Sequence, residues 1–220
     1  MIREEALGKI KEFWTGQGKD IPIYHTDIPD CRYSEYAFIL MNLPGQRATI
    51  LDAGVGASLL PAFLSSLGHS VVAADLWDKE NKSIEGSLDF AERIRRERGF
   101  TYEICQTNLS SLPFPDKYFD VVICNSTIEH ISEDGDQDIK VVKELLRVSN
   151  ELAFFTFPVT EIPKIYGDKN NLTNHPAERS YSFNTVIQRL ILPAIESGFS
   201  IIPAQGMADD GKLAVKRNPA

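Results

Sequence analysis

The sequence lacks the features that mark membrane, secreted and disulfide-rich proteins. Its 220 residues contain no apolar run long enough to span a membrane, and the charged N-terminal segment 1–14 has no apolar core of signal-peptide length. Only three cysteines are present, and Cys105 and Cys124 lie in apolar stretches, where cysteine behaves as a small hydrophobe. We therefore expect a cytoplasmic protein in a reducing compartment, without membrane contact.

Positive charge is also scarce. Lys and Arg number 23 against 31 Asp and Glu, so the formal net charge is -8. An acidic protein repels the phosphates of nucleic acids and of anionic lipids. The basic run Arg93–Arg98 is interleaved with glutamates and is typical of a solvated helix face. Nucleic acid is therefore not an expected partner.

Two common catalytic arrangements are missing as well. His25, His69 and His175 do not have the spacing of metal ligands, and the cysteines are too scattered to complete a site, so no metal is predicted. The sequence has no Gly-x-Ser-x-Gly motif, which is the signature of many serine hydrolases. The apolar share of 43% and the charged share of 25% are nevertheless those of an ordinary globular domain.

Short apolar runs alternate with helical patterns from residue 48 onward, which indicates a parallel sheet covered on both faces. The last two apolar runs, Phe199–Ala204 and Leu213–Lys216, are joined by too short a link for a parallel crossover, so they should form an antiparallel hairpin. We predict an α/β, doubly wound, mostly parallel sheet that ends in this hairpin. The expected strands before it are Thr49–Asp52, Ser70–Asp75, Tyr102–Gln106, Phe119–Asn125 and Glu151–Phe157, and the expected helices are Ala6–Trp14, Tyr33–Leu43, Ser58–Leu67, Ile84–Arg98, Gln137–Val148 and Ser182–Ser197.

The sharpest motif is the segment Ile50–Ser58, a strand that runs into a glycine turn and then into a helix. Gly54 and Gly56 can adopt backbone conformations that a Cβ forbids, and they let a ligand approach the backbone closely. Asp75 ends the next strand, at roughly the 20-residue spacing at which a carboxylate can accept hydrogen bonds from a ribose. A nicotinamide site needs a third glycine where Leu59 stands, so an NAD(P)-dependent oxidoreductase is the weaker interpretation.

These residues resemble motif I of the class I S-adenosylmethionine-dependent methyltransferases, whose loop commonly reads Asp-x-Gly-x-Gly-x-Gly. Asp52, Gly54 and Gly56 match it, while Ser58 replaces the last glycine and can serve as a helix cap. The segment Asn108–Val122 is similar to the methyltransferase type 11 subgroup, with asparagine where that subgroup usually has aspartate. The resemblance implies a Rossmann-like domain, S-adenosylmethionine as cofactor and methyl transfer to a small-molecule acceptor.

The same resemblance assigns roles to individual residues. His130, just past the fourth predicted strand, is the candidate catalytic residue that orients or deprotonates the acceptor. The departures at Ser58 and Asn108 also keep open a non-enzymatic methyltransferase-like protein that binds or acts as a scaffold. The cofactor-binding residues that the resemblance implies are Asp52, Gly54, Val55, Gly56, Asp75, Leu76, Asn108, Leu109 and Asn125.

We expect one domain over residues 1–220, because no repeat or linker divides the chain. The N-terminal helices (1–45) should form a cap or a wall of the acceptor site, together with segment 158–180. Tyr166, His175 and Arg179 are the candidates for acceptor contact within that segment. These motifs concern the cofactor half of the site and leave the acceptor and the oligomeric state open.

Overall fold

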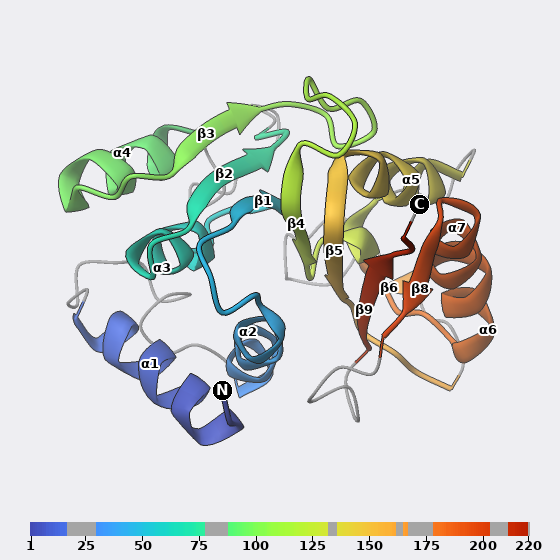
Figure 1. The fold of residues 1–220 in the computed structure, drawn as a ribbon, viewed down its shortest axis with the longest axis horizontal. Coiled ribbons are helices and arrows are strands. Elements are labelled where there is room, and N and C mark those ends of the chain that lie inside the picture. The colour runs from blue at the N-terminus through green and yellow to red at the C-terminus, as the bar shows by residue number, and fades with distance from the viewer. Residues whose placement is uncertain are drawn as a thin grey trace.

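A computed structural model describes residues 1–16, 30–77, 88–131, 136–161, 165–166, 178–202 and 211–219. Within these ranges a seven-stranded sheet has the strand order β3-β2-β1-β4-β5-β9-β8 (Figure 1). Strands β1 to β5 pair in parallel, and β9 pairs antiparallel with both β5 and β8. The predicted α/β, Rossmann-like fold with its C-terminal antiparallel hairpin is confirmed.

Two helices come first, strands and helices then alternate up to the third strand, and the fourth strand follows the third without a helix between them. The strands of the large sheet are β1 (Thr49–Ala53), β2 (Ser70–Asp75), β3 (Glu103–Gln106), β4 (Phe119–Asn125), β5 (Ser149–Thr156), β8 (Phe199–Ile201) and β9 (Lys212–Arg217). The helices are α1 (Arg3–Gly16), α2 (Asp30–Asn42), α3 (Leu60–Ser66), α4 (Leu88–Arg98), η3 (Ile128–His130), α5 (Gln137–Val148), α6 (Phe183–Val186), η5 (Ile187–Ile191) and α7 (Leu192–Glu196). Two short strands, β6 (Ile165–Tyr166) and β7 (Glu178–Arg179), pair separately.

The core consists of two apolar layers, one on each face of the sheet. Successive residues of a strand point to opposite faces. Ile50 therefore packs in the cluster that contains α1, α2, α3 and α4, whereas Leu51 packs in the cluster that contains α5 and α7. Burial on both faces explains why the central strands read as nearly continuous apolar runs.

Of the predicted helices, only Gln137–Val148 has the expected bounds, and two of the differences have a clear structural reason. The helix expected from Ser58 begins at Leu60, although Ser58 Oγ still accepts the Leu60 N–H at 3.0 Å and satisfies one donor of its first turn. The long helix expected over 182–197 is interrupted by the π-helical segment η5. Pro193 explains the interruption, because it has no N–H to donate to the Arg189 carbonyl and its ring disfavours a regular turn there.

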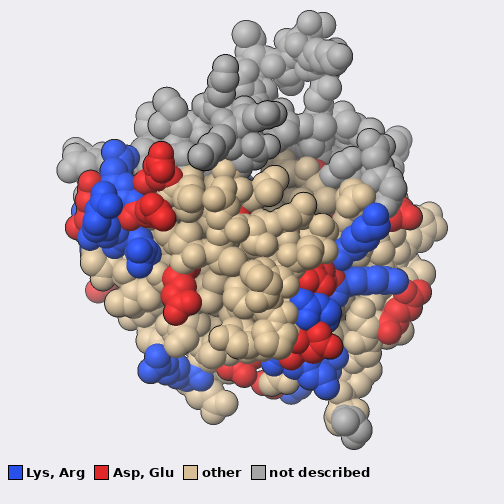
Figure 2. Space-filling model, turned by 90° about the horizontal axis from the view of Figure 1, so that it is seen from above, with Lys and Arg blue, Asp and Glu red and all other residues tan. Residues whose placement is uncertain are grey.

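The segment expected to contact the acceptor is described only in part. Tyr166 and Arg179 lie in the β6–β7 pair, while His175 and the predicted helix start at Ile84 lie outside the described residues. None of the helices in the described ranges is both long enough and apolar enough to cross a membrane. Figure 2 shows one face of the molecule, on which Lys and Arg side chains lie among Asp and Glu and do not form a continuous basic surface.

Candidate functional site

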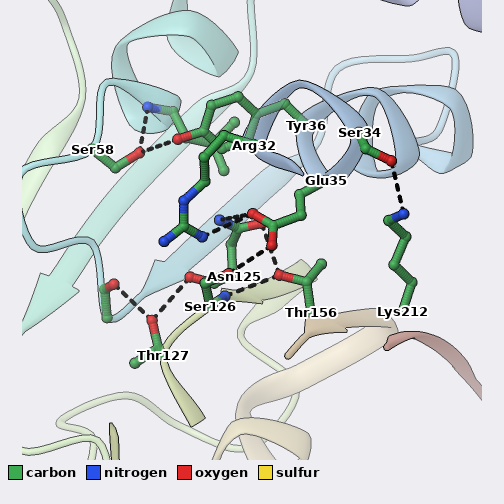
Figure 3. A network of polar contacts seen from close by, with 12 residues as sticks. Arg32, Ser34, Glu35, Tyr36, Ser58, Asn125, Ser126, Thr127, Thr156 and Lys212 are labelled. Carbon is green, nitrogen blue, oxygen red and sulfur yellow. Dashed lines mark hydrogen bonds and ion pairs between the residues drawn. The ribbon is translucent and has the colours of Figure 1, made fainter. Parts of the chain in front are cut away.

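The candidate site lies where the parallel strands β1, β2 and β4 end. The glycine loop follows β1, Asp75 ends β2, and Asn125 ends β4, so the predicted residues meet at one edge of the sheet. Helix α2 covers this edge, and its Glu35 side chain binds Asn125 and Ser126 at the end of β4 (Figure 3). Carboxyl ends of parallel strands are the usual ligand-binding edge in such folds.

The two glycines of the loop are required for different reasons. Both have positive φ, +79° at Gly54 and +55° at Gly56. A Cβ on Gly54 would overlap the side chain of Thr127, whose hydroxyl donates to the Gly54 carbonyl at 2.8 Å. A Cβ on Gly56 would meet no described atom within 4 Å. Gly54 therefore joins the loops after β1 and β4, whereas Gly56 leaves room beside the backbone for a ligand.

Asp75 binds the glycine loop directly. Its Oδ2 accepts the Gly56 N–H at 2.6 Å and its Oδ1 accepts the Trp77 N–H at 3.2 Å. The Trp77 indole N–H in turn donates to the Gly56 carbonyl at 3.0 Å. Each carboxylate oxygen can accept more than one hydrogen bond. The side chain is only partly buried, so it can hold the loop and still accept hydroxyl groups of a ligand.

Asp52 lies behind the loop, with 2% of its surface exposed. Burial, together with the nearby Asp75 carboxylate, raises the pKa of Asp52 to about 8. Its Oδ2 atom has no hydrogen-bond partner among the described residues. The carboxyl group is therefore mostly protonated at neutral pH.

A polar network joins α2 to the ends of β4 and β5 (Figure 3). Glu35 accepts hydrogen bonds from Ser126 Oγ at 2.7 Å and from Asn125 Nδ2 at 3.3 Å, and Arg32 pairs with it at 2.8 Å. The Asn125 Oδ1 atom accepts the Thr156 hydroxyl at 3.0 Å. Both ends of the Asn125 amide are thus held by protein groups, so Asn125 connects α2 to the sheet. Its predicted contact with a cofactor stays a prediction.

Tyr36 links α2 to the start of α3. Its hydroxyl lies 3.0 Å from Ser58 Oγ, which also accepts the Leu60 N–H. Burial raises the pKa of Tyr36 to about 12, so the phenol is neutral and can donate to Ser58. The serine in the place of the last motif glycine therefore anchors α2 over the site.

The remaining predicted residues surround this edge. Asn108 is exposed, and its Oδ1 accepts the Ser110 N–H at 2.9 Å, so part of the acceptor capacity assigned to a cofactor is used within its own turn. His130 lies in η3 and is half-buried. Its backbone N–H donates to the Thr127 carbonyl at 2.9 Å. The apolar members are Val55 and Leu109, which are buried, and Leu76, which is 50% exposed.

Sequence reasoning missed Arg32, Glu35 and Thr156. Glu35 and Asn125 are far apart in the chain, and no local pattern predicts that a helix so early in the sequence contacts the end of the fourth strand. The available signal was compositional, because charged residues occur in the middle of an otherwise apolar segment. Within the described ranges, no group of three or more His, Cys, Asp or Glu side chains is arranged to hold a metal ion.

The central segment is similar to known methyltransferases. Residues 51–156 match the family model described as a methyltransferase domain. The ubiquinone biosynthesis O-methyltransferase of Rickettsia felis is 32% identical over 132 residues, 58% of this chain and 49% of that protein. The ubiquinone/menaquinone biosynthesis C-methyltransferase of Vibrio parahaemolyticus is 33% identical over 132 residues, 56% of this chain and 47% of that protein. The chain therefore spans about half the length of either relative.

A solved structure extends the likeness to the whole fold. The 1,6-didemethyltoxoflavin-N1-methyltransferase of Burkholderia thailandensis, crystallised with its substrate and S-adenosylhomocysteine, superposes with a TM-score of 0.63. The superposition covers 100% of this chain and 92% of that protein at 15% sequence identity. At that identity the likeness concerns the fold, including the helices before β1 and the hairpin after β5.

Proposed function

We propose that this chain binds S-adenosylmethionine at the carboxyl edge of its sheet and transfers the methyl group to a small-molecule acceptor, because residues 51–156 match the model of a methyltransferase domain. The observation that carries the proposal is the arrangement of Asp75 and Gly56. The carboxylate fixes the loop through the Gly56 N–H, and the space beside Gly56 is open to a ligand. A ribose placed there would find an acceptor for its hydroxyls in Asp75.

Arg32 is the residue that we propose for the carboxylate of the cofactor. One N–H of its guanidinium pairs with Glu35, and its side chain is 35% exposed. Figure 3 shows that it extends from α2 toward the edge where Asn125 and Thr127 lie. A guanidinium group has five N–H donors, so the pair with Glu35 leaves donors for an anionic ligand.

Methyl transfer from S-adenosylmethionine requires little of the protein beyond the positioning of the two reactants. S-adenosylmethionine supplies an activated methyl group when bound, and correct placement of two reactants can lower a barrier by several kcal/mol. A base is needed only where the acceptor must lose a proton, and a well-placed base then contributes about 10²–10⁴-fold. We propose His130 for that role, because η3 directly follows the end of β4.

An assay with methyl-labelled S-adenosylmethionine tests the proposed function. Intermediates of ubiquinone biosynthesis are the first acceptors to test, since two relatives are named for that pathway. We expect S-adenosylhomocysteine to form, and we expect His130→Ala to reduce turnover about 10²–10⁴-fold with cofactor affinity intact. His69→Gln is the matched control, because His69 lies at the opposite edge, where it accepts the Ala48 N–H.

Two outcomes would contradict these assignments. Binding of the cofactor without methyl transfer to any acceptor would identify a binding or scaffold protein. Full turnover of His130→Ala would remove His130 from the reaction and leave positioning alone to explain the rate.

A further inference from the structure

The structure holds a carboxyl group in a place where its ionised form is unfavourable. Asp52 is the fourth residue of β1 and is almost completely buried, so water does not solvate its charge. Its Oδ2 atom has no donor among the described residues. A buried polar atom without a partner requires an explanation, because native proteins satisfy nearly all such atoms. A proton on the carboxyl group, or a cationic ligand beside it, would explain why this buried atom has no protein donor.

The groups that interact electrostatically with Asp52 come from three elements. None of these groups carries a positive charge. In the described part of the chain, the charge that acts on Asp52 is the negative one of Asp75 on β2. Cys124 on β4 and Tyr36 on α2 also interact with Asp52, and burial raises the pKa of both groups, so both are neutral. The cation of α2, Arg32, is paired with Glu35. The negative charge of Asp75 thus acts on Asp52 without a counter-charge from these neighbours.

We propose that Asp52 is protonated in the cofactor-free protein and loses this proton when the cationic part of S-adenosylmethionine binds, so that cofactor binding releases a proton to solvent. The inference rests on the proposed function. A cation near a buried carboxyl group favours the charged form, whereas a second carboxylate disfavours it. The arriving ligand therefore reverses the balance that Asp75 and burial set in the free protein.

The proton on Asp52 makes the affinity for the cofactor depend on pH, and the direction of this dependence is fixed. The pKa of Asp52 in the free protein is about 8, and a bound cation lowers it. Below pH 8 the ligand must displace a proton, so affinity falls about tenfold for each pH unit of acidification. Between pH 8 and pH 6 we expect Asp52 to cause a loss of about fifty-fold, and above pH 8 its contribution to the pH dependence should level off.

Isothermal titration calorimetry at pH 7 in buffers of different ionisation enthalpy measures the number of protons released. We expect the wild-type protein to release close to one proton more per bound S-adenosylmethionine than Asp52→Asn. This difference removes the contribution of the cofactor's own amino group, which also titrates near pH 8. Asp120→Asn is the matched control, because Asp120 lies at the start of β4, where it binds Thr49, and it should not change the release.

Two further ligands show which cationic group of the cofactor causes Asp52 to lose its proton. S-adenosylhomocysteine keeps the ammonium group but has no sulfonium, and 5′-methylthioadenosine has neither. We expect the Asp52-dependent release to be absent with 5′-methylthioadenosine. Release with S-adenosylhomocysteine assigns the effect to the ammonium group, and release with S-adenosylmethionine alone assigns it to the sulfonium. Equal proton counts for wild type and Asp52→Asn would overturn the proposal.

Carbon-13 NMR of the aspartate side chains tests Asp52 without any ligand. We expect one carboxyl carbon to titrate near pH 8 in the free protein and to be missing in Asp52→Asn. Titration of Asp52 near its ordinary value of about 4 would overturn the proposal even if the cofactor binds. Failure of the wild-type protein to bind S-adenosylmethionine would instead overturn the proposed function, so the two failures are distinguishable.

Discussion

Gly54→Ala is expected to destabilise the protein by about 2–5 kcal/mol, which is the sum expected for overpacking and for a left-handed alanine. The added Cβ would overlap Thr127, and the φ of +79° disfavours any L side chain. The loops after β1 and β4 must then separate, so we expect cofactor affinity to fall as well. Urea denaturation followed by circular dichroism measures the change in the free energy of unfolding.

Two controls separate overlap from backbone strain. Thr127→Gly removes the overlapping atoms, so the double variant should be more stable than the sum of the single effects predicts. Gly8→Ala, in α1, places a Cβ where no described atom lies within 4 Å, and it should be neutral or stabilising by up to about 1 kcal/mol. A Gly54→Ala protein as stable as wild type would show that Thr127 does not fix this loop.

Asp52→Asn is expected to stabilise the cofactor-free protein at pH 8 while it weakens cofactor binding. In the wild-type protein the pKa of Asp52 rises from 3.8 to about 8 on folding. The stability that this shift provides is fully present below pH 3.8 and is lost as the pH rises through about 8. The amide group that replaces the carboxyl group in this variant does not ionise. The free energy of unfolding of the variant should therefore not decrease in this way as the pH rises.

The difference between the two proteins should therefore grow with pH. At ~1.36 kcal/mol for each pH unit, it should increase by up to about 4 kcal/mol between pH 5 and pH 8. Urea denaturation of both proteins across this range measures it, and Asp120→Asn again serves as the control. If wild type and Asp52→Asn showed parallel dependence on pH, Asp52 would not be protonated in the folded protein.

The fold could be predicted because its signals are local. Apolar runs, their spacing and the short link before the last strand depend on neighbouring residues, and β2 and β4 have the predicted bounds. The position of β9 between β5 and β8 was not evident, because pairing order depends on contacts between distant segments. The π-helical segment was missed for a related reason, since a helical pattern does not reveal how Pro193 is accommodated.

The candidate site divides in the same way. Gly54, Gly56 and Asp75 occur in a short motif whose conformation and spacing the sequence reveals. The helix that covers them could be predicted as a helix, but its side-chain partners could not. Glu35 and Asn125 meet only because the chain brings α2 across the ends of β4 and β5. Motifs therefore predict the glycine loop and Asp75, and the contacts that α2 makes with the strand ends depend on tertiary structure.

Calorimetric titration of S-adenosylhomocysteine into the wild-type protein and into Asp75→Ala tests whether the cofactor binds at the carboxyl edge of the sheet. We expect a single site, with the binding free energy reduced by about 1.5–3 kcal/mol in the variant because a charged acceptor of two hydroxyls is lost. Asp75→Asn, which keeps the shape of the side chain and one acceptor, should show a smaller loss. Circular dichroism must show that both variants are folded. Unchanged affinity in a folded Asp75→Ala protein would contradict the account and place the cofactor elsewhere.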